Sequence, residues 1–180
     1  MRPVICALLA LSASATVASA ATELTIILQF DGRHSDLSVS EMKRELQSLM
    51  RDSGTALSWR NSAELAAGES FPRVVVARFH GSCQMMPLAA PLLGDGEPLG
   101  YSHISNGEMI PFADVECDRV RAELRTRHGA PGDDLTLGRA MGRILAHELH
   151  HIIDHTRTHA RTGIMRKSLS PQDLIAARTL

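Results

Sequence analysis

Five of the nine histidines in this chain lie within residues 146–165, which read AHELHHIIDHTRTHARTGIM. In that stretch, His147, Glu148 and His151 form the pattern H-E-x-x-H. On a helix, positions i and i+4 lie on the same face about one turn apart, so these two imidazoles can converge on one ion. Glu148 can then reach toward a water on that ion instead of the ion itself. The pattern has this chemical use only if the segment is helical.

The residues before the pattern favour a helix from about Leu135 to Asp154, because an apolar stripe at helical spacing leads into it. The stripe consists of Leu137, Met141, Ile144, Leu145 and Ile152. Gly138 and Gly142 leave one face without side chains, which we expect to allow close packing against a sheet. A surface helix that merely carries histidines is the alternative. The stripe, a further histidine and the G-I-M sequence that follows favour a metal site.

A catalytic zinc site takes three ligands from the protein and keeps a fourth position for water. His155 continues the face of His147, but it would lie about 12 Å away along the helix axis. His150 is rotated by roughly 100° from His151, so we expect it to be packed or exposed instead. The polar, β-branched run after residue 154 is a poor helix, so the chain can turn and bring His159 back. We therefore predict His147, His151 and His159 as ligands, with His155 or a distant acidic residue as alternatives.

The rest of the chain carries strand and helix signals separated by turn residues. Runs rich in β-branched apolar residues predict strands, and helical spacing of apolar residues predicts helices. We expect segments 81–100 and 129–134 to be irregular. The predicted strands are 24–30, 55–60, 73–80, 99–105 and 108–115, and the predicted helices are 38–54, 117–127 and 135–154. This order predicts one α+β domain built around one small mixed sheet.

Short local signals mark the ends of these elements. Ser38 with Glu41 three residues later reads as a capping box at the start of the first helix, and Gly54 supplies its stop. Asn106 and Gly107 form a turn that makes the last two strands a hairpin. Pro111 has no amide hydrogen to donate, so it confines the second arm of the hairpin to an edge or a broken strand.

Residues 1–20 are typical of a secretory signal peptide. Arg2 precedes a short apolar run that ends in Ala18-Ser19-Ala20, so we expect cleavage after Ala20. An uncleaved N-terminal anchor is the alternative. The mature chain, residues 21–180, is then expected to be secreted or periplasmic.

The composition of the mature chain limits its partners and its redox state. Loss of Arg2 from 19 basic side chains leaves 18 against 20 acidic ones, a balance that suits neither nucleic acid nor an anionic membrane. We also expect a monomer. Cys83 and Cys117 are expected to form a disulfide rather than two free thiols, worth about 3–4 kcal/mol by loop entropy.

H-E-x-x-H, a third histidine after a turn, and a following G-I-M resemble the metzincin branch of zinc peptidases. In the usual spacing, H-E-x-x-H-x-x-G-x-x-H, the glycine would fall on Asp154 and the third ligand on Arg157, so this chain departs from it. The spacing H-E-x-x-H-x7-H with GIMR at 163–166 resembles small secreted bacterial metzincin-like proteins. The resemblance covers about residues 137–174. It implies a zincin/metzincin-like domain with one zinc per chain and Met165 in a tight turn beneath the metal.

The resemblance also implies an activity, that of an exported zinc metallopeptidase, specifically a metalloendopeptidase. Glu148 would take a proton from the zinc-bound water and pass it to the leaving amine. The substrate would lie antiparallel along an edge strand, here 99–105. Family members often add a tyrosine that stabilises the oxyanion. Tyr101 is the candidate here, with His103 on the same face, and an ordinary place in the strand is the alternative.

Two other functions fit the same residues. The histidines could hold zinc or copper in an exported protein without catalysis, or the chain could be a degenerate zincin that acts as an interaction module. The presence of both Glu148 and Met165 favours the enzyme, because a pure metal binder does not need a carboxylate at that position.

Overall fold

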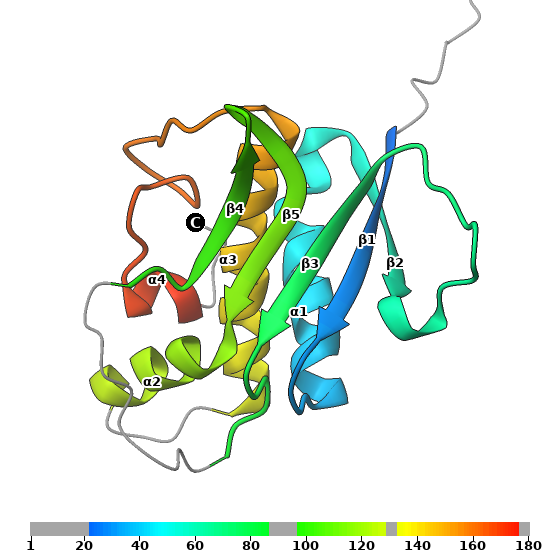
Figure 1. Ribbon diagram of the computed structural model, residues 1–180. Coiled ribbons are helices and arrows are strands. Elements are labelled where there is room, and N and C mark those ends of the chain that lie inside the picture. Colours follow the sequence, from blue (N-terminus) through cyan, green and yellow to red (C-terminus); the bar gives the residue numbers. More distant parts are fainter. Residues whose placement is uncertain (1–21, 87–96, 129–132, 177–180) are drawn as a thin grey trace, which may run out of the picture.

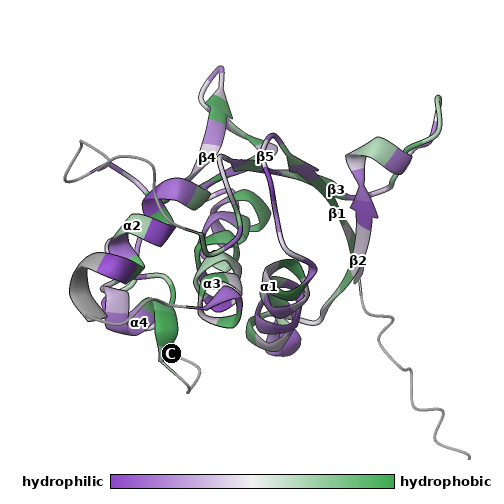
Figure 2. Cartoon of the chain, turned by 90° about the horizontal axis from the view of Figure 1, so that it is seen from below, coloured by the Kyte–Doolittle hydropathy of each residue, from purple (hydrophilic) through white to green (hydrophobic). Residues whose placement is uncertain are grey.

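The computed structural model describes residues 22–86, 97–128 and 133–176. The proposed signal peptide lies outside these residues, as do 87–96 and 129–132 of the two segments expected to be irregular. The described chain forms a five-stranded mixed sheet with two long helices against one face, as Figure 1 and Figure 2 show. A mixed α and β fold on a small mixed sheet agrees with the prediction. Among the described helices, none is both long and apolar enough to cross a membrane.

The sheet has the strand order β2-β1-β3-β5-β4. Its strands are β1 (Thr22–Phe30), β2 (Thr55–Asn61), β3 (Val74–His80), β4 (Gly100–Ser105) and β5 (Glu108–Glu116). The first four in spatial order run parallel, and β4 pairs antiparallel with β5. Alternate residues of the inner strands, such as Ile26, Ala77 and Val115, are buried in the core. Among the described strands, β4 is at the edge of the sheet, so one of its sides has no strand partner there.

The β4–β5 hairpin turns at Asn106 and Gly107, whose positive φ values of 51° and 84° suit a two-residue turn. The expectation that Pro111 would put the second arm at an edge is wrong, because β5 lies between β3 and β4. The pairing is broken instead. The register between β4 and β5 shifts between Ser102 and His103. As a result, Pro111 pairs with no residue of β3 or β4.

Helix α1 (Asp36–Leu49) begins earlier than predicted. Its N-cap is Ser35, whose side chain accepts a hydrogen bond from the amide of Ser38, so the predicted cap at Ser38 is wrong. Ser38 lies inside the helix, where its buried hydroxyl donates to the carbonyl of Cys83 at 2.6 Å. Glu41 binds Arg44 rather than closing a capping box. Two serines three residues apart carry the same cap chemistry, and in the structure Ser35 caps the helix while Ser38 contacts Cys83.

Helix α3 (Asp134–Ile153) lies beside α1 under the sheet, as Figure 2 shows. Gly138 and Gly142 face α1, not the sheet as expected. A Cβ atom on Gly138 would lie 2.7 Å from Cβ of Glu41, and one on Gly142 would lie 2.8 Å from the carbonyl oxygen of Met42. The two glycines therefore permit close approach of two helices rather than of a helix and a sheet.

Two ion pairs, one of them buried, join α3 to α1. Nε of Arg143 donates to Oε1 of Glu45 on α1 at 2.7 Å, and both side chains are buried. The other nitrogens of Arg143 donate to two backbone carbonyls around the short helix α4 (Pro171–Ile175). Arg139, one turn earlier, links Glu41 to the same segment. Helix α3 is thus joined to α1 and to the last part of the described chain.

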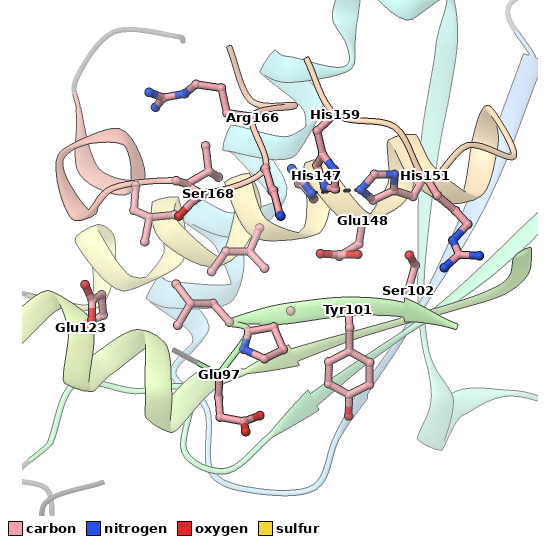
Figure 3. A pocket seen from close by; sticks show the side chains of 18 of the residues that line it. Glu97, Tyr101, Ser102, Glu123, His147, Glu148, His151, His159, Arg166 and Ser168 are labelled. Carbon is pink, nitrogen blue, oxygen red and sulfur yellow. Dashed lines mark hydrogen bonds between the residues drawn. The ribbon is translucent and has the colours of Figure 1, made fainter. Parts of the chain in front are cut away.

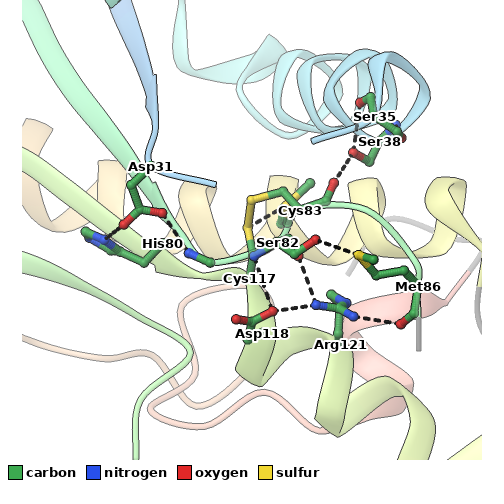
Figure 4. Close-up of a disulfide and its surroundings, with 12 residues drawn as sticks. Asp31, Ser35, Ser38, His80, Ser82, Cys83, Met86, Cys117, Asp118 and Arg121 are labelled. Atoms are coloured by element: carbon green, nitrogen blue, oxygen red, sulfur yellow. Dashed lines mark hydrogen bonds and ion pairs between the residues drawn. A yellow bond between two sulfur atoms is a disulfide. The ribbon is translucent and has the colours of Figure 1, made fainter. Parts of the chain in front are cut away.

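The predicted disulfide between Cys83 and Cys117 is confirmed and is drawn in Figure 4. It joins the loop after β3 to the first residue of α2 (Cys117–His128), with the two Cα atoms 5.0 Å apart and both residues buried. The amide of Cys83 also donates to the carbonyl of Arg33 at 2.7 Å, and its carbonyl accepts from Ser38. The bridge therefore holds three segments together at one end of the sheet.

We predict that Gly138→Ala destabilises the protein by roughly 1–3 kcal/mol, because the new methyl group overlaps α1. Without this overlap, alanine would stabilise the helix by about 1 kcal/mol relative to glycine, so a loss of stability would point to the close contact. Urea denaturation measures the free energy of unfolding. Leu135→Ala, at an exposed position of the same helix, is the control and should change it by less than about 0.5 kcal/mol. A Gly138→Ala protein as stable as wild type contradicts the close contact.

Candidate metal centre

Three imidazoles converge on one side of α3. His147 and His151 project from the same face of the helix, and His159 returns to them from the segment that follows, as Figure 3 shows. One ring nitrogen of each lies within 4.8 Å of the other two. The rings of His147 and His159 stack with centroids 5.2 Å apart, and His151 meets both at steep angles. The structure thus brings the three predicted ligands together.

Two backbone carbonyls orient two of the rings. Nδ1 of His147 lies 2.8 Å from the carbonyl oxygen of Ile164, and Nδ1 of His151 lies 2.9 Å from that of Thr156. A carbonyl can only accept, so each Nδ1 carries the proton and each Nε2 keeps a lone pair. Burial lowers the pKa of both histidines, against the effect of the carbonyl hydrogen bonds, and the neighbouring imidazoles lower it further. Both rings are therefore neutral at neutral pH.

This set of donors fits zinc. The Nε2 atoms of His147 and His151 face each other at 3.1 Å, and two lone pairs with no proton between them repel. A cation bound by both removes that conflict. Tetrahedral zinc with nitrogens at about 2.0–2.1 Å places two ligand atoms about 3.3–3.4 Å apart, close to this separation. The carbonyl partner on Nδ1 is the usual outer support of a metal-binding histidine.

The other two histidines of the stretch lie outside this group. His155 has a positive φ of 46°, and the next amide, of Thr156, donates to the carbonyl of His151 at 3.1 Å. This Schellman-type ending stops the helix and reverses the chain. His150 points to the exposed side, where its Nδ1 lies 2.9 Å from the carboxylate of Asp154.

The segment after the third imidazole forms a tight turn over residues 163–166. Gly163 has a φ of 75°, and its carbonyl accepts from the amide of Arg166 at 3.3 Å. The amide of Ala160 donates to the carbonyl of Met165 at 2.8 Å. Ile164, within the turn, supplies the carbonyl that orients the first imidazole. The turn therefore connects the first and third imidazoles through the backbone. The role of the Met165 side chain stays a prediction.

Glu148 follows the first imidazole on α3 and points toward β4, as Figure 3 shows. The residue is only 6% exposed, and this burial raises the pKa of its carboxyl to about 7, against hydrogen bonds with the side chain and backbone of Ser102 that lower it. A carboxyl with a pKa near neutrality can both accept and release a proton at neutral pH. Ser102 was not predicted, because a serine in a strand carries no sequence signal of such a contact.

Tyr101 is not placed for the role predicted for it. Successive residues of a strand point to opposite faces, and Figure 3 shows Ser102 directed toward Glu148 and Tyr101 away from it. Burial raises the pKa of Tyr101, and so does its hydrogen bond with Asp114. His103 lies on the same outer face, with Nε2 2.9 Å from Asp114. The sequence correctly put Tyr101 and His103 on one face, but the alternation alone could not tell which face meets the imidazoles.

A cleft of about 1040 Å³ extends along the imidazoles, between β4 and the segment after α3. Apolar side chains of Leu99, Ile104, Ile144, Leu169 and Leu174 line it together with the polar residues described above. Gly100 allows the strand to lie close to the helix, because a Cβ atom there would meet the side chains of Ile144 and Glu148. The unpaired side of β4 is thus available to an extended chain beside the imidazoles.

The fold is similar to the crystal structure of an archaemetzincin from Methanopyrus kandleri, with a TM-score of 0.51. The two sequences are 17% identical, and the match covers 88% of each chain. A scan against protein-family models and a search of curated proteins find no match. At this identity the likeness concerns the fold alone, and at that level it agrees with the zincin-like domain that the sequence resemblance implies.

We predict that the purified protein holds one zinc per chain and that His159→Ala loses it, since two imidazoles alone leave the site incomplete. Metal analysis after dialysis measures the stoichiometry. Chelation should also lower the melting temperature of wild type but not of His159→Ala, because bound metal stabilises the folded state.

The matched control is His155→Gly, since glycine tolerates the positive φ at this position. It should keep the zinc. Zinc retained in His159→Ala and lost in His155→Gly contradicts this choice of third ligand.

Proposed function

We propose that this chain is an exported zinc-dependent metallopeptidase in which His147, His151 and His159 hold the metal and Glu148 acts as the general base. The observation that carries the proposal is the buried carboxyl of Glu148 next to three converging imidazoles and an edge strand. A site that only stores metal has no need of a buried proton acceptor beside its ligands.

Each part of the site has a task in peptide hydrolysis. Zinc, when bound, supplies a positive charge that acidifies water and stabilises negative charge on a carbonyl oxygen. Glu148 accepts a proton from the attacking water and passes it to the leaving amine. Ser102 fixes the direction of the carboxyl through its hydrogen bonds. The open side of β4 binds the peptide backbone by adding it to the sheet, and the cleft excludes water around the scissile bond.

Export is part of the proposal. The disulfide between Cys83 and Cys117 supports it, because such bonds persist in oxidising compartments. Residues 1–20 would direct the chain to the periplasm or the medium and would be removed after Ala20. The substrate is proposed to be a peptide or protein, with the enzyme acting as a monomer.

We predict that Glu148→Gln lowers kcat for peptide hydrolysis by about 10²–10⁴-fold and leaves zinc binding intact, since glutamine keeps the shape but cannot accept the proton. Cleavage of a quenched fluorescent peptide library, with zinc analysis of the same samples, measures both. Glu23→Gln, the same chemical change in the exposed start of β1, is the control and should have full activity. A wild type that binds one zinc but cleaves no peptide contradicts the enzyme and favours an exported metal-binding protein.

We predict that Ser102→Ala lowers kcat by about 3–10-fold with little change in KM, because the carboxyl of Glu148 loses a hydrogen bond that positions it. Ser102→Thr keeps a hydroxyl and should restore most of the rate. Steady-state kinetics on a peptide found in the library separates kcat from KM. Equal rates for the alanine and threonine variants would show that the hydroxyl has no part in positioning the base.

A further inference from the structure

We infer that the cleft selects peptides with carboxylate groups beside the scissile bond, and that Arg157 and Lys167 recognise them. This inference rests on the proposed function, because it names the substrate class of the same site.

The segment that closes the cleft over the imidazoles is strongly basic. Residues 155–170 contain four basic and no acidic side chains, although the whole chain has a formal net charge of −1. The four are Arg157, Arg161, Arg166 and Lys167. Such a concentration of charge in an otherwise balanced protein creates a local positive potential beside the site.

Two of these four cations line the cleft and have no ion-pair partner among the described residues. Arg157 and Lys167 line it and are exposed, and neither forms an ion pair within the part of the chain that the structure describes. Arg166 also lines the cleft but pairs with Asp173. Arg161 is exposed and is not among the lining residues. The unpaired positive charge in the cleft therefore comes from Arg157 and Lys167.

The two cations flank the imidazoles. Arg157 directly follows Thr156, whose carbonyl holds the ring of His151. Lys167 lies three residues after Ile164, whose carbonyl holds the ring of His147. Since these rings are one helical turn apart, the cations are attached to opposite ends of the cluster. A peptide lying across the imidazoles along β4 would have one cation on each side of its scissile bond.

The facing wall of the cleft does not cancel this charge. The β4 residues that line it, from Gly100 to Ile104, carry no acidic side chain. Glu97 is paired with Arg119, and Figure 3 shows Glu97 and Glu123 away from the imidazoles. Among the acidic residues that line the cleft, the buried Glu148 is thus the one beside the imidazoles, and the exposed charge near them is positive.

The test uses three quenched fluorescent peptides of equal length with amidated ends, whose two residues on each side of the scissile bond are Glu, Gln or Lys. At low ionic strength we expect kcat/KM for the Glu peptide to exceed that for the Gln peptide about 5–20-fold, and the Lys peptide to be the poorest. Arg157→Gln and Lys167→Gln should each reduce the Glu-to-Gln ratio about 2–5-fold. Arg161→Gln is the control and should leave the ratio unchanged. A fourth peptide, the Gln sequence with a free C-terminal carboxylate, distinguishes a side-chain carboxylate from a chain terminus.

A binding measurement distinguishes failure of this inference from failure of the proposed function. Fluorescence anisotropy of the same peptides on Glu148→Gln protein reports charge preference without turnover. Preference for the Glu peptide in binding, with no cleavage by wild type, would support recognition of carboxylates by Arg157 and Lys167 and overturn the peptidase. Cleavage or binding with equal preference for Glu and Lys peptides, or an equal effect of Arg161→Gln, would overturn the inference.

Discussion

The site depends on the position of α3, which carries His147, Glu148 and His151. The contact of α3 with α1 sets that position. Gly138 and Gly142 remove the side chains that would hold the two helices apart, and the buried Arg143–Glu45 pair joins them. Breaking such a pair leaves an uncompensated charge in the interior, so it resists rotation of the helix. A rotation by one residue, roughly 100°, would turn the imidazoles out of the cleft. A constraint in the core therefore fixes the direction in which the histidines point.

The side chains of the site are held by two neighbours of α3, the segment that follows it and the edge strand β4. Carbonyls at Thr156 and Ile164 hold two imidazoles from the segment after the helix, whereas Ser102 holds the carboxyl of Glu148 from the edge strand. The two supports come from opposite sides of the cleft.

Periodic signals in the sequence were sufficient for the main elements and for the imidazoles. β-branched runs located β1 and β3, and the i, i+4 spacing put His147 and His151 on one helix face. The spacing of residues could not show which face of a helix or strand packs against which neighbouring element. The glycine face of α3 could have met a sheet or a helix, and either face of β4 could have met the imidazoles. The sequence predicted Ser38 as the cap, whereas the structure uses Ser35, and the hydroxyl of Ser38 donates to the carbonyl of Cys83.

The long spacer before His159 follows from how α3 ends. With His155 at positive φ, the chain reverses, and the carbonyl of Thr156 is committed to the ring of His151. Arg157, two residues after this reversal, lines the cleft. The third imidazole comes from His159, which is followed by Ala160, whose amide donates to the carbonyl of Met165 in the turn at 163–166. The reversal of the chain and the orientation of the His151 ring thus follow from one helix ending.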